Sequence, residues 1–328
     1  MAVPQIPMKY TFIKLNLSVF AHYGPHLLFT FVFCCGFELI HNFAVPCRNF
    51  LRWLVPCAFI LKTMPVYLQY YFWLIAASLS CFLLERLHPW RKQQKVLRKG
   101  IWQDLFWLAF NGHFFGLLFA IVAGKLVIGL NSVLYSWGWP VPQDIVLLIA
   151  APLWVQFIVF FLLKDFVEWN IHRMLHNVPW LWEFHKLHHS IRELDWLGNF
   201  RFHWGEVIVY KTLSYLPLII LGVDATVLLI IAVLWTFMLD LNHSNIKFNW
   251  GPLRYILNSS AMHVWHHDEE LHGKGGQNFG QVLSIWDWLF KTAYWPEDEQ
   301  QPKQLGFANQ SRYPKGLIRR LLYPFWKK

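Results

Sequence analysis

Several long stretches of this chain carry almost no charge, and they restrict the possible folds more than any other feature. From Val66 to Leu84 there are nineteen residues without a charged side chain. At about 1.5 Å per residue, a helix of this length spans roughly 30 Å of hydrocarbon. Charged residues make up only 15% of the 328-residue chain, and hydrophobic residues 56%. This composition excludes a disordered chain and an ordinary soluble enzyme, and it favours an integral membrane protein.

The apolar pattern predicts an all-α, multi-pass protein with about four membrane spans, a re-entrant helical hairpin and a histidine-rich helical cap. The expected spans are 26–45, 66–84, 105–124 and 145–163, with an interfacial helix over 47–64. The hairpin arms, 207–221 and 225–239, are short for complete spans and return the chain to the same face. We expect three regions: N-terminal membrane helices with a basic linker (1–100), a catalytic domain (101–295) and a basic amphipathic tail (296–328).

Basic residues set the expected orientation. The stretch 85–99 holds six of them, whereas the loop 125–144 holds one. By the positive-inside rule, the first of these lies on the cytoplasmic side, together with 164–206 and 241–328. The net charge is +10, and the basic residues lie between the apolar runs. This pattern suits binding to anionic lipid headgroups rather than to nucleic acid. The terminal Lys327-Lys328 does not match a dilysine retrieval signal, so we expect a bacterial inner membrane rather than the endoplasmic reticulum.

Histidine is concentrated in one part of the chain. Eleven of the sixteen histidines lie between residues 172 and 272, in the motifs HRMLH, HKLHH and HVWHH. On a helix, residues three and four positions apart share a face, so the rings of each motif can converge on an ion. His203 and His243 lie singly between the motifs. The candidate metal ligands are His172, His176, His185, His188, His189, His203, His243, His263, His266 and His267.

The hairpin between the histidine-rich stretches returns the chain to one membrane face, so all three motifs can build one site. Their imidazoles exceed the four or five ligands that one zinc or iron ion takes, which predicts two metal ions. Imidazole suits iron, zinc, copper and nickel, so ligand type alone does not select the metal. A thiolate site is not expected, because no cysteine lies beyond Cys81. Carboxylates that could orient the rings are Asp165, Glu168, Glu183, Glu206, Asp240 and Asp268.

The three histidine motifs in this order resemble those of the sterol desaturase/fatty acid hydroxylase superfamily of membrane di-iron oxidases. Three further segments are similar to elements of that family: LWEFHKLHHS at 181–190, Asn278-Phe-Gly280, and WDWLF at 286–290. A departure occurs at His203, which is followed by Trp204 where the family often has proline. The resemblance covers roughly residues 100–295.

This resemblance implies a pair of iron ions, with zinc able to substitute in a purified sample, and O2 as cosubstrate. The implied reaction is hydroxylation of an unactivated C–H bond of a lipid. Asp165, Glu206 and Asn278 are then the candidate catalytic residues. Electrons would come from an external donor of the cytochrome b5 or ferredoxin type, since the chain shows no haem or iron–sulfur motif.

Three other functions stay open at this point. Within the family, the protein could be a lipid or sterol desaturase or a sterol C4-methyl oxidase. A divalent-metal transporter is disfavoured, because it would place polar ligands midway along the spans, whereas these motifs lie outside them. A non-catalytic metal-binding membrane protein is the third alternative.

Overall fold

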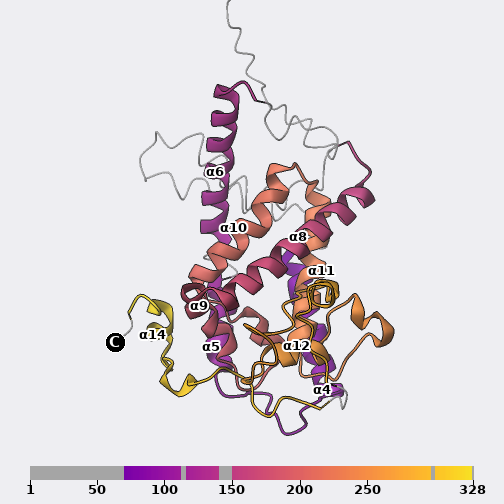
Figure 1. The fold of residues 1–328 in the computed structure, drawn as a ribbon, viewed down its shortest axis with the longest axis vertical. Helices are drawn as coiled ribbons and strands as arrows, with labels where there is room; N and C mark the ends of the chain where they lie inside the picture. Colours follow the sequence, from indigo (N-terminus) through magenta and orange to yellow (C-terminus); the bar gives the residue numbers. More distant parts are fainter. Residues whose placement is uncertain (1–69, 112–115, 140–149, 297–299, 327–328) are drawn as a thin grey trace, which may run out of the picture.

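The computed structural model describes residues 70–111, 116–139, 150–296 and 300–326, and helices joined by turns and irregular segments make up this part of the chain (Figure 1). No β-strand occurs among them, and β-type pairing is confined to isolated bridges. The expected span 26–45 and the interfacial helix 47–64 lie outside the described residues. The long helices are α4 (Tyr70–Leu87), α5 (Ile101–Ala109), α6 (Gly116–Ser136), α8 (Leu153–Asn177), α9 (Pro179–His189), α10 (Trp204–Ile220) and α11 (Ala225–His243). The shorter helices are α12 (Ser260–His266), α13 (Ile285–Leu289) and α14 (Leu317–Leu322), with 3-10 turns η6 (Trp196–Phe200), η7 (Gly251–Tyr255) and η8 (Gln310–Arg312).

Two of the described helices, α4 and α11, are long and apolar enough to cross a membrane. Helix α4 covers most of the expected span 66–84. Helix α11 covers the second hairpin arm, and half of its most apolar window is buried inside the protein, as in a core helix. The expected span 105–124 overlaps the end of α5 and the start of α6, and the expected span 145–163 overlaps the first half of α8. These findings support a membrane protein.

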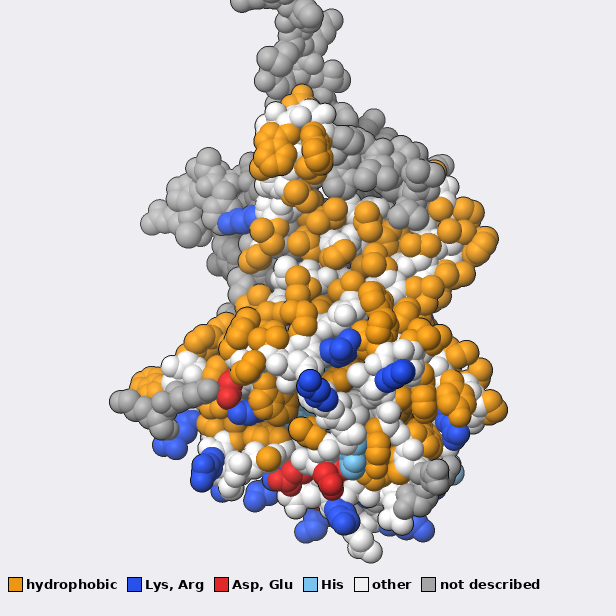
Figure 2. All heavy atoms as spheres, viewed as in Figure 1, with side chains coloured by type: hydrophobic (Ala, Val, Ile, Leu, Met, Phe, Trp, Pro, Cys, Tyr) orange, Lys and Arg blue, Asp and Glu red, His pale blue; other side chains and the backbone are white. Residues whose placement is uncertain are grey.

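The molecule divides into an apolar part and a polar body. Helices α6, α8 and α10 extend into the upper part in Figure 1, whereas α5, α9, α12 and α14 lie in the lower body. The upper part is covered largely by hydrophobic side chains, and Lys and Arg gather over the lower body (Figure 2). This distribution is typical of a protein that places one end in lipid and the other in water.

Helices α10 and α11 occupy the predicted hairpin, and both pack against α8. The turn between them ends at Asp224, whose carboxylate accepts a hydrogen bond from the Thr226 amide at 2.7 Å and caps α11. The buried core of this region contains Phe160 of α8, Leu218 of α10 and Ile231 of α11. Because α11 also packs against α12, this core connects the apolar helices with the histidine-rich body.

A sharp corner joins α8 and α9 and sets the distance between the first two histidine motifs. Val178 lies between the helices in an extended conformation, with φ −96° and ψ 114°. Pro179 follows at the first position of α9. A residue before proline is pushed out of the helical region, whereas proline itself is well suited to begin a helix. The HRMLH motif at the end of α8 is therefore folded back towards the HKLHH motif of α9.

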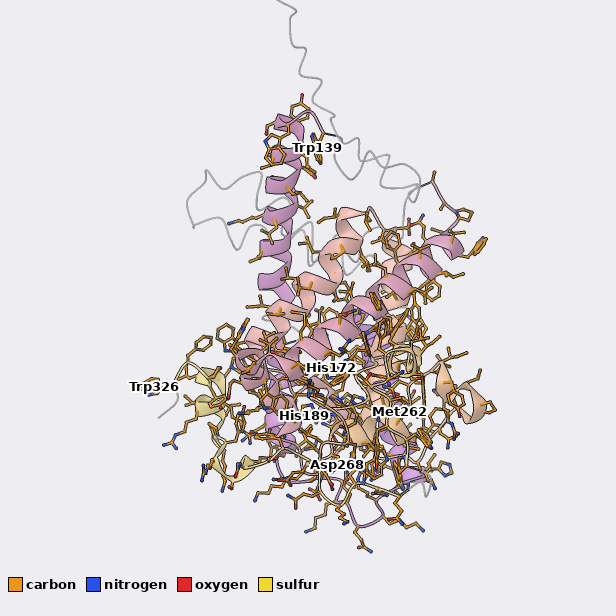
Figure 3. All side chains as sticks on the ribbon, in the orientation of Figure 1. Trp139, His172, His189, Met262, Asp268 and Trp326 are labelled. Atoms are coloured by element: carbon orange, nitrogen blue, oxygen red, sulfur yellow. The ribbon has the colours of Figure 1, made fainter. Side chains whose placement is uncertain are left out.

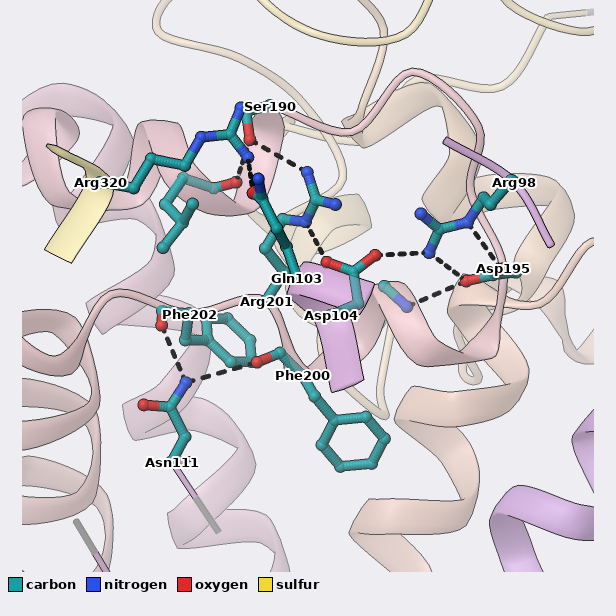
Figure 4. A network of polar contacts seen from close by, with 12 residues as sticks. Arg98, Gln103, Asp104, Asn111, Ser190, Asp195, Phe200, Arg201, Phe202 and Arg320 are labelled. Carbon is teal, nitrogen blue, oxygen red and sulfur yellow. Dashed lines mark hydrogen bonds and ion pairs between the residues drawn. The ribbon is translucent and has the colours of Figure 1, made fainter. Parts of the chain in front are cut away.

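A buried network of ion pairs fastens the segment after α9 to the segment before α5 (Figure 4). Arg98 donates to both Asp195 and Asp104, at 2.5 and 2.7 Å. Arg201 also donates to Asp104 and lies 3.3 Å from the Ser190 hydroxyl. Arg98 is one of the six basic residues of the stretch 85–99, which the sequence predicts to lie on the cytoplasmic side, but its side chain is buried. Its charge is matched by carboxylates, so it contributes little to the surface potential that the positive-inside argument uses.

Lys164 is a second buried cation. It was expected at the cytoplasmic end of the span 145–163, but it is fully buried and donates to Glu168 one turn later at 2.5 Å. Its ammonium group also lies 3.6 Å from the ring centroid of Trp235. Because Trp235 belongs to α11 and donates its indole N–H to Glu168 at 2.6 Å, this pair fixes α8 against α11.

Candidate metal centre

The structure brings nine histidine side chains together in the lower body, in two adjacent groups. Within each group the ligand atoms all lie within 4.8 Å of one another. The five-histidine group contains His172, His176, His185, His189 and His266, and the four-histidine group contains His188, His243, His263 and His267. All are buried except His176, which is half-buried. His172 and His189 lie inside the body, in the region where α8 meets α9 (Figure 3).

Each HxxHH motif divides its histidines between the two groups. His185 and His189 of α9 belong to the five-histidine group, while His188 belongs to the other. In the third motif the division is reversed: His263 and His267 join the four-histidine group and His266 the five-histidine group. Residues four apart project on nearly the same side of a helix, whereas adjacent residues differ by about 100°. A single helical turn can therefore serve two neighbouring ions, which the spacing alone did not disclose.

Backbone carbonyls and one carboxylate fix the ring orientation in the five-histidine group. His172 and His266 donate from Nδ1 to the carbonyls of Phe279 and Gln277, each at 2.8 Å. The Nδ1 of His185 lies 2.7 Å from the Glu206 carboxylate. An acceptor at Nδ1 places the proton there, so the Nε2 lone pair of each ring is available to a metal ion.

These lone pairs face one another. The Nε2 atoms of His172 and His185 are 3.2 Å apart, and the other nitrogen of each ring already has an oxygen partner. In the four-histidine group, His243 donates from Nδ1 to its own helix at Leu239. Its Nε2 then lies 3.2 Å from Nε2 of His188 and 3.1 Å from that of His263. Two acceptor nitrogens at hydrogen-bond distance repel each other unless a cation lies between them.

Further ring nitrogens are buried without a hydrogen-bond partner in the described part of the chain. They are Nε2 of His176, His189 and His266, Nδ1 of His188 and His263, and both nitrogens of His267. Buried polar atoms are otherwise almost always satisfied, so such a concentration in one place requires a ligand. The donor set is nitrogen only, which fits iron, zinc, copper or nickel. The residues present therefore fit a pair of transition-metal ions.

The imidazoles of this centre are held in the neutral form. Burial lowers the pKa of His185, His188 and His189 well below its ordinary value, and the neighbouring imidazoles lower it further. The same holds for His263, His266 and His267 of the third motif. A metal ligand must be unprotonated, so at neutral pH these rings are ready to bind without first losing a proton.

The tenth candidate ligand, His203, lies outside both groups. Its Nδ1 accepts a hydrogen bond from the Gly205 amide at 3.0 Å, and its Nε2 lies 3.2 Å from the Leu321 carbonyl near the C-terminal helix. The ring packs beside Phe184 and Trp204. Both ring nitrogens are thus occupied by backbone groups. This position coincides with the departure from the family pattern that the sequence shows after His203.

The three candidate catalytic residues occupy different places. Glu206 contacts His185, as described above. Asp165 accepts hydrogen bonds from the amides of Val282 and Leu283 and from the Trp286 indole. The Asn278 side chain bonds to backbone groups of Met262 and Tyr294. Asp165 and Asn278 therefore organise the loop that follows α12, whereas Glu206 touches a ring of the centre.

The other carboxylates named from the sequence contact groups outside the centre. Asp240 accepts from Ser78 and Asn199, and Asp268 pairs with His272 at 2.7 Å. Glu183 pairs with Lys186 on the same helix. Sequence reasoning missed the main-chain acceptors at Gln277 and Phe279 entirely. The only signal near them is the Asn278-Phe-Gly280 element, which marks the loop but not the carbonyls that it presents.

Aromatic rings cover the imidazoles. Phe202 stacks on His188 with a centroid distance of 4.7 Å and an interplanar angle of 6°. Phe279 packs against His172, His176 and His266. Such walls exclude water and hold the rings in one rotamer. A helical body that places two adjoining sets of buried, neutral imidazoles beside apolar helices defines the class of histidine-box membrane proteins.

Comparison with known proteins finds similarity across this histidine-rich region. Residues 157–292 match the fatty acid hydroxylase family. The chain is 32% identical to the ornithine lipid hydroxylase OlsE of Rhizobium tropici over 177 residues, which are 54% of this chain and 52% of that protein. It is 27% identical to methylsterol monooxygenase 1-1 of Arabidopsis thaliana, over 42% of this chain and 46% of that one. It is 29% identical to human alkylglycerol monooxygenase, over 40% and 29% of the two chains.

These similarities support the predicted resemblance to the sterol desaturase/fatty acid hydroxylase superfamily, and they lie in the histidine-rich part of the chain. The matched region contains all nine clustered histidines and the loop 277–281, so the comparison and the geometry point to the same part of the molecule. The chain spans about half the length of the first two of these relatives. No solved structure matches it.

Proposed function

We propose that the protein is an integral membrane, O2-dependent di-iron oxidase that hydroxylates an unactivated C–H bond of a lipid. The observation that supports this proposal above all others is the convergence of nine buried imidazoles in two adjacent groups, with lone pairs directed at one another. The activities for which the relatives are named, those of an ornithine lipid hydroxylase and several monooxygenases, support oxygen chemistry on a lipid. We assign the catalytic unit to residues 101–295.

The nature of the reaction favours iron among the metals that imidazole binds. Zinc has no redox chemistry, so a zinc-loaded sample would be inactive even though zinc could occupy the same ligands. When bound, the iron pair would supply the activation of O2. The chain would hold it with the five-histidine group (His172, His176, His185, His189 and His266) and the four-histidine group (His188, His243, His263 and His267).

The protein's own residues would contribute orientation and a dry, apolar surrounding. Glu206 and the carbonyls of Gln277, Phe279 and Leu239 direct the ring nitrogens inward. Partners of this kind typically change metal affinity by about 10–100-fold. The apolar faces of α8, α10 and α11 adjoin the centre, and a lipid chain offers no polar group for recognition at the reacting carbon. Selectivity would then come from how these faces position one carbon beside the metals.

The membrane arrangement is part of the proposal. The apolar upper part would lie in the bilayer through about four spans and the re-entrant hairpin α10–α11, and the histidine-rich body would form a cap on the cytoplasmic side. The exposed lysines and arginines of the lower body agree with this orientation (Figure 2). A bacterial inner membrane is favoured over the endoplasmic reticulum.

Hydroxylation consumes one O2, two electrons and two protons for each C–H bond and yields an alcohol and water. The electrons must come from a separate carrier of the cytochrome b5 or ferredoxin type, because the described residues carry no second redox site. Matches to methylsterol monooxygenases keep sterol C4-methyl oxidation as the second candidate, and desaturation as the third.

Comparative lipid mass spectrometry of cells with and without the protein tests the proposal. A hydroxylase adds one oxygen atom to a membrane lipid, whereas a desaturase removes two hydrogen atoms. The product should vanish in His188→Ala and persist in His88→Ala, because His88 is an exposed histidine outside both groups. Oxidation that persists in His188→Ala, or a lipid profile that does not depend on the protein, would overturn the assignment.

A further inference from the structure

The loop 277–281 supplies both carbonyls that orient rings of the five-histidine group, but it has no regular secondary structure to hold it in place. Gln277 and Phe279 present these carbonyls to His266 and His172. Asn278 between them adopts a left-handed backbone with φ 55°. At Gly280 an added Cβ would lie 2.4 Å from the Leu283 carbonyl oxygen, so only glycine fits there. The position of this loop is therefore fixed by its contacts with other parts of the chain.

One buried carboxylate, that of Asp287 in α13, contacts the loop at two successive amides. It accepts hydrogen bonds from the amides of Phe279 and Gly280 at 3.0 and 2.7 Å. It also accepts from the Trp169 indole at 3.0 Å and from the Thr292 hydroxyl at 2.6 Å. The side chain is almost completely buried. The Asp287 carboxylate thus joins the loop 277–281 to Trp169 of α8 and to Thr292.

A second buried carboxylate holds the other end of the same loop. Asp165 of α8 accepts from the amides of Val282 and Leu283 and from the Trp286 indole. Trp286 is the neighbour of Asp287, and Trp169 lies one turn after Asp165. Helix α8 and helix α13 therefore exchange hydrogen bonds across the loop, and α8 also carries the ligand His172.

We infer that Asp287 is a positioning residue for the metal centre, which acts through the main chain of Phe279 on His172 and, along the same loop, on His266. This inference rests on the proposed function. Because both rings belong to the five-histidine group, loss of Asp287 weakens that site selectively. The four-histidine group is unaffected, since His243 takes its acceptor from Leu239 of its own helix.

Asp287→Asn is the direct test, because the amide keeps the shape of the side chain but replaces one acceptor oxygen by a donor that faces amide N–H groups. Cobalt(II) is the probe, titrated into the metal-free protein in detergent, and its visible absorption bands report ligand geometry. We expect two binding phases in the wild type. In Asp287→Asn, one phase should weaken by roughly 10–100-fold with an altered spectrum, and the other should stay unchanged.

Asp104→Asn is the matched control, since it also alters a fully buried carboxylate but lies in the ion-pair network away from the loop. It should destabilise the fold and leave both cobalt phases in place. Trp169→Phe provides a milder variant that removes one donor to Asp287 and keeps an aromatic ring, should Asp287→Asn fail to fold. It should weaken the same phase to a smaller extent.

Wild-type cobalt affinity and spectrum in folded Asp287→Asn, or in folded Trp169→Phe where the first variant does not fold, would overturn the inference. Equal weakening of both phases would also overturn it, because a general structural role would act on the whole centre. Failure of the wild type to bind cobalt would instead contradict the proposed function itself, so the two failures are distinguishable.

Discussion

The Nε2 atoms of His172 and His185 lie 3.2 Å apart, and the Nδ1 atom of each ring has a fixed oxygen partner, the Phe279 carbonyl for His172 and the Glu206 carboxyl group for His185. These two residues come from different helices that meet at the corner formed by Val178 and Pro179. The contact is unfavourable in the absence of a cation and favourable with one. A metal ion bound between them would therefore stabilise the packing of α8 against α9 as well as supply chemistry.

The two groups should bind metal as separate sites. We expect His263→Ala, which removes a ligand from the four-histidine group, to lower the metal content from about two ions per chain to about one, because the five-histidine ligand set stays complete. Elemental analysis of protein purified under iron-replete conditions measures this content. His88→Ala should retain both ions. Complete loss of metal in His263→Ala would show that the two groups form one indivisible site.

Glu206 should control metal affinity through His185. In Glu206→Gln the carboxyl group beside the His185 Nδ1 is replaced by an amide of nearly the same volume, so the ring has a weaker hydrogen-bond partner and becomes a weaker ligand. We expect a loss of affinity of about 10–100-fold, measured by competition with a chromophoric chelator. The exposed Glu270 offers a matched Glu→Gln control, which should bind as the wild type does. Unchanged affinity in Glu206→Gln would rule out this role.

The buried ion network should contribute strongly to stability. Asp104→Asn removes the carboxylate shared by Arg98 and Arg201 and leaves two buried guanidinium groups with only one carboxylate between them, that of Asp195. Breaking a buried pair in this way costs about 3–5 kcal/mol. Glu269→Gln breaks the more exposed pair with Arg192 and should cost at most about 1 kcal/mol. Unfolding in detergent with increasing denaturant compares the two, and a similar midpoint for both would contradict the expectation.

The metal-free protein should lose stability in acid. Burial lowers the pKa of His188, His189 and His267 well below that of an exposed imidazole, so below about pH 6.5 the unfolded chain binds protons that the folded chain does not. As the pH falls below 6.5, each such ring lowers the free energy of unfolding by up to about 1.4 kcal/mol per pH unit. The metal-free protein therefore has its full stability only above pH 6.5. Thermal midpoints recorded between pH 7.5 and 5.5 measure this effect. The slope should be shallower in His189→Gln, and a midpoint independent of pH would contradict the neutral, buried state of the rings.

Much of the fold class and the location of the site could be predicted from the sequence. Apolar runs indicate helices of membrane length, and the spacings in HRMLH, HKLHH and HVWHH place imidazoles on helix faces, since both features depend on geometry within a few turns. The division of each HxxHH motif between two groups could not be predicted in the same way. It depends on how helices α8, α11 and α12 pack around α9.

Local sequence thus determined that this protein carries apolar helices and a histidine-rich region with the spacing of a metal site, because helix periodicity fixes which neighbours share a face. Tertiary structure alone decided which nitrogen of each ring points inward and that His203 lies beside the Leu321 carbonyl. It also decided that Arg98 is buried against Asp104 and Asp195, and that the Phe279 carbonyl meets His172 across 107 residues of chain. Contacts between residues so distant in sequence arise only when whole helices pack, and no spacing within the chain encodes them.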